Sequence, residues 1–231
     1  MALGANIGNR ITDIIGSEYS TIPDLSYKDL INSAFNEVVD MVSEDLLLKY
    51  SKTPGVLQSN SEWLVEDRKI LKVIRVDSDT GGIERECNPV DRQTFAMAGD
   101  VESIYFATAH SPIYHFDSEN NGAATLKILP EPGSTQKGKI WYFSYATNST
   151  DLSAITYATL NTSHYLPGTL IHSIVLKSCI NILNAYISNF IQDDEDTELA
   201  QLVGTQIQSL QTSFEKEMAR FTDPEKPSGA E

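Results

Sequence analysis

The residues of this sequence that could do chemistry are few and widely separated. They include four histidines and two cysteines: His110, His115, His164, His172, Cys87 and Cys179. A structural zinc site collects four such ligands at short spacings, commonly with a CxxC pair. Neither cysteine has a neighbour of that kind, and the histidines are not spaced as a ligand set. We therefore expect no metal site and two reduced thiols, Cys87 in a strand and Cys179 on an apolar helix.

Two acidic segments could hold a hard cation. The segment DSDTGG, residues 77–82, begins like a calcium loop, but that pattern requires acidic residues where Gly81 and Asn88 stand. The segment DDED, residues 193–196, precedes a helical pattern, and the helix dipole favours carboxylates at that position. We interpret the first segment as a hairpin turn and the second as a solvated helix start.

Motifs of catalysis or nucleotide binding are missing from the sequence. It contains no GxSxG elbow, no Walker loop and no GxGxxG turn, the patterns that supply a nucleophile or a cradle of backbone N–H groups for phosphate. We expect a protein that is not an enzyme and that uses no cofactor.

Aromatic residues are concentrated in the middle of the chain. They are Tyr105, Phe106, Tyr114, Phe116, Trp141, Tyr142, Phe143 and Tyr145. Such a set could stack nucleic-acid bases, but that function also needs a basic groove, and only a few lysines lie nearby. We interpret the set as core and interface residues, with Trp141, Phe143 and Tyr145 as a β-domain interface.

The net charge limits the partners of the chain. Its 231 residues include 32 acidic and 17 basic ones, for a net charge of −15. Binding phosphates or anionic lipid requires clustered Lys and Arg. No run approaches the ~20 apolar residues of a membrane span, and residues 1–20 lack the features of a signal peptide. We expect neither nucleic-acid nor membrane binding.

Helical periodicity marks both ends of the chain. Residues 26–50 carry an apolar stripe and predict one helix that begins at Ser26: Leu30, Ala34, Val38, Val42 and Leu46. Residues 3–15 show a similar spacing, weakened by glycines. Residues 170–190 have an apolar face too wide for one neighbour, and residues 199–218 carry a stripe that should fold back on them.

The middle of the chain has the period of β-strands. Residues 69–76 and 83–87 flank a turn, and residues 112–116 and 124–129 flank the Asn121–Gly122 hairpin signal. A short helical turn is expected within residues 89–100. Residues 126–146 predict a last hairpin, whose first strand ends at Pro130 and Pro132, because proline cannot donate to a ladder.

These patterns predict an α+β fold. We expect a helical bundle, formed by the N-terminal helix and a long C-terminal helical hairpin, with an inserted antiparallel β-domain that resembles a sandwich or barrel. The expected divisions are residues 1–62 (N-terminal helical segment), 63–150 (inserted β-domain), 151–222 (helical hairpin packed on the N-terminal helix) and 223–231 (extended tail).

The order of these elements resembles the head-to-tail adaptor, or connector, proteins of tailed bacteriophages, of the tail tubular protein A type. The residues that carry the resemblance are PIYHF at 112–116, LKILPEP at 126–132, IWYFSY at 140–145, and Pro167 with the helical hairpin at 170–221. It covers the chain from about residue 20 onward and consists of an order of elements with one L-x-I-L-P-x-P phrase.

The resemblance implies a structural virion protein in the neck of the particle, present in the host cytoplasm during assembly. Such adaptors form a ring, usually of twelve copies, beneath the portal protein. The ring extends the DNA channel and docks the next tail component: a nozzle, tail tube or stopper. DNA passes without specific binding, which suits an acidic wall.

The tail of the chain is the expected docking segment for the portal or a neighbouring copy. Its composition predicts disorder unless a partner holds it. In related adaptors the C-terminal segment reaches the portal. The residues that would dock are Phe221, Pro224, Pro227 and Glu231.

Three alternatives remain. One is another neck or tail component, such as a stopper or tail terminator. Another is a ligand-binding β-module with a helical frame, which predicts a monomer and a defined pocket. The third is an enzyme.

Overall fold

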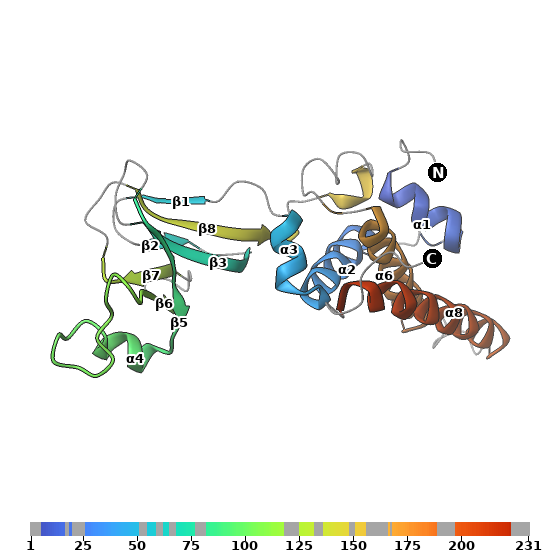
Figure 1. Cartoon of the computed structure of the whole chain (residues 1–231). Coiled ribbons are helices and arrows are strands. Elements are labelled where there is room, and N and C mark those ends of the chain that lie inside the picture. Colours follow the sequence, from blue (N-terminus) through green and yellow to red (C-terminus); the bar gives the residue numbers. More distant parts are fainter. Residues whose placement is uncertain are drawn as a thin grey trace. The chain divides into compact units, whose positions relative to one another are not determined.

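The chain is an α+β protein. The computed structural model describes residues 6–16, 19, 26–50, 55–58, 62–64, 68–76, 82–117, 125–131, 136–147, 151–155, 166, 168–188 and 197–222. The chain divides into two compact units (Figure 1). Residues 1–50 and 145–231 form the helical unit, and residues 51–144 form the β unit. Within the described residues, no helix is long and apolar enough to span a membrane.

The helical unit is built around one buried helix. Its elements are α1 (Ile7–Ile15), α2 (Tyr27–Met41), α3 (Glu44–Tyr50), the short 3-10 helix η2 (Leu152–Ala154), α6 (Gly168–Tyr186) and α8 (Thr197–Thr222). Helices α1, α2 and α8 all pack against α6. The prediction that this helix needs more than one neighbour is therefore confirmed.

Helix α6 also buries two of its serines. Ser173 and Ser178 are fully buried. The Ser178 hydroxyl donates to the carbonyl of Ile174 at 2.8 Å, and that of Ser173 to the carbonyl of Thr169 at 3.4 Å. Hydroxyls that bond the preceding turn can enter a core without a partner from another element. Polar residue type alone therefore does not mark the solvent face of this helix.

The expected single helix over residues 26–50 is wrong, because the chain breaks at Val42. Val42 is extended, with φ −78° and ψ 138°. Ser43 lies between this break and the first residue of α3. Its carbonyl accepts from the N–H groups of Leu46 and Leu47 at 3.1 Å, and acidic residues follow in the first turn of α3. The break lets Leu47 become fully buried. The predicted stripe had instead placed Leu46 on the buried face.

Helix α1 is regular despite its glycine. Asn6 caps it by accepting from the N–H of Asn9 at 2.7 Å, and Ile7, Ile11 and Ile15 form its buried face. The Gly8 residue that weakens the helical pattern has a tertiary role. A Cβ at Gly8 would lie 3.0 Å from the carbonyl oxygen of Ser153 in η2, so the glycine permits a close approach of the two elements.

The β unit contains two four-stranded sheets and a short helix. The first sheet has the order β1 (Gly55–Gln58), β8 (Gln136–Ser144), β3 (Arg68–Val76), β4 (Glu84–Glu86). The second has the order β2 (Glu62–Leu64), β7 (Thr125–Leu129), β6 (Ile113–Asp117), β5 (Asn88–Pro89), and α4 (Arg92–Met97) follows β5. The β3–β4 and β6–β7 pairs are antiparallel, as predicted.

The expected last hairpin within residues 126–146 is wrong. Strand β7 pairs with β6 and β2, whereas β8 pairs with β3 and β1 in the other sheet. Two prolines follow β7, and neither can donate to a ladder. The carbonyl of Pro130 instead accepts from the buried guanidinium of Arg75 in β3 at 2.9 Å. The chain therefore leaves one sheet and enters the other.

The two sheets contribute to one hydrophobic cluster. It contains Val73 and Ile140 from the first sheet, Leu126 and Ile128 from the second, and Cys87 between β4 and β5. Burial raises the pKa of the Cys87 thiol to about 12. A thiol with this pKa is protonated and inert near neutral pH, so Cys87 serves as a small apolar core residue.

Candidate functional site

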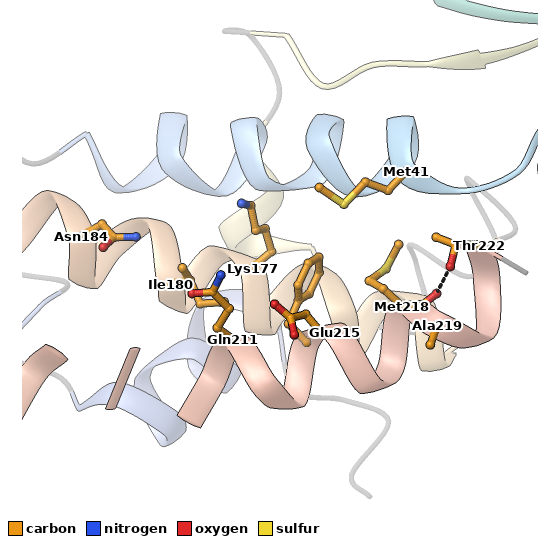
Figure 2. A pocket seen from close by; sticks show the side chains of 10 residues that line it. Met41, Lys177, Ile180, Asn184, Gln211, Glu215, Met218, Ala219 and Thr222 are labelled. Carbon is orange, nitrogen blue, oxygen red and sulfur yellow. Dashed lines mark hydrogen bonds between the residues drawn. The ribbon is translucent and has the colours of Figure 1, made fainter. Parts of the chain in front are cut away.

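An open groove lies along the helical unit between α2, α6 and α8 (Figure 2). Its volume is about 530 Å³, and its lining mixes apolar and polar side chains: Met41, Lys177, Ile180, Asn184, Gln211, Phe214, Glu215, Met218, Ala219 and Thr222. Met41 comes from α2, and its side chain is 44% exposed. The groove is large enough for a few apolar side chains of a partner.

One ion pair crosses the wall of this groove. Lys177 extends from α6 toward α2 (Figure 2). Its Nζ lies 2.8 Å from Oε2 of Glu37. The same ammonium lies 5.9 Å from the ring centroid of Phe214. Burial disfavours the charged form of Glu37, but hydrogen bonds from Lys177, Ser33 and Asn181 outweigh this effect and lower its pKa. The pair therefore joins α2 to α6.

A second polar feature holds the segment that follows β8. Asn32, Asn36 and Asp40 are spaced four residues apart, on one face of α2. The Asn36 amide donates to the Ala146 carbonyl at 3.0 Å and accepts from the Ala146 N–H at 2.8 Å. We call Asn32, Asn36 and Asp40 the backbone clamp.

The other two clamp residues extend this contact in both directions. Asn32 donates to the carbonyl of Thr147 at 3.0 Å. Asp40 accepts from the hydroxyl of Tyr145 at 2.5 Å. Burial and the bond to Asp40 both raise the pKa of Tyr145, so its hydroxyl keeps its proton. The clamp fixes the position at which the chain re-enters the helical unit.

The third feature is an exposed apolar loop after α4, residues 101–106. Val101 is 74% exposed, Ile104 is 91% exposed, and Tyr105 and Phe106 are also exposed. Large apolar side chains gathered in this way on a surface commonly mark an interaction site. No Lys or Arg occurs between Arg92 and Lys127, so the charges of the loop region are those of carboxylates.

Backbone hydrogen bonds order the apolar loop. The N–H of Ser103 donates to Asp100, that of Phe106 to Ser103, and that of Ala107 to Ala98, each at 3.0 Å. Ala98 and Ala107 are buried together with Ile113 beneath it. Because the loop is already ordered, a partner would not have to supply its ordering free energy on binding.

The predicted docking residues fall in different places. Phe221 lies at the end of α8, is 8% exposed, and its carbonyl accepts from the N–H of Ser43 at 3.4 Å. Pro224, Pro227 and Glu231 lie outside the described residues. The buried stripe of α8 thus continues past Met218 to Phe221, and any docking by the tail would start after this residue.

The predicted interface on the aromatic strand is also divided. Trp141 and Phe143 are two residues apart on β8. Trp141 is half-buried, and Phe143 is 4% exposed. Tyr145 belongs to the helical unit, through its bond to Asp40. The three residues are therefore divided between the two units.

The sequence patterns missed the backbone clamp and the apolar loop. A signal for the clamp exists, because Asn32, Asn36 and Asp40 repeat every four residues, which places them on one face of a helix. The apolar loop has no periodicity, and its residues resemble core residues. Among the described residues, no cluster of His, Cys, Asp and Glu could hold a metal ion.

Comparison with known proteins adds no family. No protein-family model matches the chain, and no curated protein matches it.

Proposed function

We propose that this chain is a structural neck protein of a tailed bacteriophage, which forms a ring that joins the portal to the tail and extends the DNA channel. The observation that carries the proposal is the insertion of one unit into another. Helices from both ends of the chain form one unit, and residues 51–144 form a separate β unit between them. This is the order of elements that the resemblance to head-to-tail adaptors implies.

Two further features support a passive structural role. The net charge of −15 suits a channel wall that duplex DNA must pass without sticking, because cationic walls would retain it. The ionisable pair Glu37–Lys177 and the pair Asp40–Tyr145 both hold elements of the chain together.

The β unit would serve as the docking arm of the ring. The finer fold that we propose for it is a small sandwich, supported by the cluster to which both sheets contribute. Its apolar loop would enter an apolar pocket of the next neck component, and the carboxylates of Asp100 and Glu102 would require a basic rim on that partner. The portal would be met by the segment after Thr222.

The long helix α8 favours an adaptor over a tail terminator. Tail terminators are mostly β proteins, whereas here α6 and α8 pack together over most of the C-terminal part. A ligand-binding β-module is less well supported, since the groove described above lies in the helical unit.

Electron cryomicroscopy of virions that contain the chain tests the proposal. The expected result is a closed ring of copies between portal and tail, with a continuous central channel. A single copy per particle, or density elsewhere in the virion, would overturn it. A nanomolar, strongly salt-dependent affinity of the isolated chain for duplex DNA would contradict the channel role.

A further inference from the structure

Helix α8 carries a long surface without charge. Between Glu198 and Glu215 there is no Asp, Glu, Lys or Arg, although the chain as a whole is 21% charged. Eight residues of this stretch are exposed. Two of them are Gln211 and Ser213, and the other six lie on one side of the helix: Gln201, Leu202, Thr205, Gln208, Ser209 and Thr212. We call these six residues the neutral face. Solvent-exposed helices usually carry charged side chains on their outer face, so the neutral face is unusual.

Two hydroxyls of the neutral face are already hydrogen-bonded within the helix. The hydroxyl of Thr205 donates to the carbonyl of Gln201 at 2.9 Å, and that of Thr212 to the carbonyl of Gln208 at 3.0 Å. Their donors are satisfied within the helix, so covering them does not leave an unpaired O–H group. Leu202 adds a side chain that is 67% exposed, whose burial would stabilise a contact.

The neutral face is best suited to a partner with the same charge as the chain itself. A basic partner would be attracted to any of the acidic surfaces and would gain nothing from a neutral one. A second copy, which also carries a net charge of −15, is repelled elsewhere and can approach closely where charges are missing. Interface cores are likewise depleted of charged residues.

We infer that the neutral face of α8 is the surface on which a second copy of this chain docks. The inference deepens the proposed function and rests on it in one respect: this contact would join neighbouring copies of the ring. The self-association that it predicts can be measured without the virion.

Added charge gives the first test. Gln201→Glu and Gln208→Glu keep the shape of the side chain and add one carboxylate each. Gln93→Glu makes the same change at an exposed position of α4 in the β unit and serves as the matched control. By sedimentation velocity, each α8 variant should weaken self-association by about tenfold, since like charges at an interface oppose binding. The control should match the unaltered chain, and circular dichroism should be unchanged for all three.

Ionic strength gives the second test. Because the contact contains no charges of its own, salt screens only the repulsion between copies. Association of the unaltered chain should therefore strengthen from low to high salt. A contact made of ion pairs would weaken instead, and that result would overturn the inference.

Cross-linking locates the contact. Burial raises the pKa of Cys87 and Cys179 to about 12, so an introduced thiol should react selectively with a maleimide photo-cross-linker. Thr205→Cys should give a covalent dimer on illumination, and Ala96→Cys, exposed on α4, should not.

The outcomes separate the inference from the proposed function. Self-association that persists in both α8 charge variants, or that cross-links through residue 96 instead of residue 205, would overturn the inference. Neither result would contradict the proposed ring. A chain that stays monomeric at high concentration and high salt also overturns the inference. Copies that associate through α8 but are found outside the neck of the virion would instead overturn the proposed function.

Discussion

The two units of this chain differ in where they place large apolar side chains. In the helical unit, the described residues that expose one are Met41 and Leu202, whereas the β unit exposes six: Ile83, Val101, Ile104, Tyr105, Phe106 and Phe116. Helix α6 packs against neighbouring helices on several sides, so its apolar surface is buried within the helical unit. The β unit keeps apolar side chains outside its clusters, which suits a surface for another protein. The helical unit thus buries most of its large apolar side chains, and the β unit leaves more of them on its surface.

The largest effects should come from the two cores. Leu183→Ala in α6 and Leu126→Ala in β7 each remove a fully buried side chain and should each lower the free energy of unfolding by about 2–5 kcal/mol. Hydrogen exchange should show lost protection in the unit that carries the change. Equal loss in both units after either change would mean that they unfold as a single cooperative body.

Truncation of the tail should separate folding from docking. Removing the chain after Arg220 deletes the buried Phe221 and should lower the stability of the helical unit by about 3 kcal/mol. Removal after Thr222 keeps the whole of α8 and should leave the thermal midpoint unchanged. Only the proposed attachment to portal-bearing heads should then be lost. Normal attachment of this shorter chain would show that the tail is not the docking segment.

The backbone clamp should have a smaller effect on stability. Asn36→Ala removes two hydrogen bonds to Ala146 and should lower the free energy of unfolding by about 1–2 kcal/mol. Urea denaturation measures this loss. Gln208→Ala, at an exposed position of α8, is the control and should change stability much less. Equal effects of the two variants would show that the clamp does not stabilise the fold.

The Glu37–Lys177 pair should contribute less than 1 kcal/mol, because the carboxylate side chain is 40% exposed and solvent screens the interaction. The pKa of Glu37 is lowered in the folded chain. Its contribution is therefore present above the unfolded value of about 4.3 and is lost as the pH falls through the folded value. Unfolding curves of Glu37→Gln and the unaltered chain should differ at pH 7 and converge in acid. A difference that persists in acid would assign the effect to packing.

The apolar loop should have the smallest effect on stability. Ile104→Ser changes a side chain that is 91% exposed, so the free energy of unfolding should stay within about 0.5 kcal/mol of the unaltered chain. Joining to the next neck component should nevertheless fail in an assembly assay. Ile83→Ser, at another exposed position of the β unit, should leave joining intact. If both variants join normally, the β unit does not dock through this loop.

Element types were largely predictable from periodicity, and pairing was not. The stripes of α1, α6 and α8 and the strands β3, β6 and β7 follow from residues that alternate or recur locally. The partner of β8 depends on residues far away in the chain. Local turn chemistry around Pro130 suggested a hairpin, but the Arg75–Pro130 contact and the pairing with β3 place β8 in the other sheet.

The sequence by itself determined the α+β class, the acidic character and the order of helix, β-insertion and helices, because composition and local periodicity are properties of the chain. Only the tertiary structure decided which of these residues remain exposed. Ile104 and Leu47 are both large aliphatic residues, yet one is 91% exposed and the other fully buried. Exposure depends on which residues pack nearby in space. The break at Val42 and the turn after α4 determine those neighbours, which are too far apart in the chain for a local pattern to predict them.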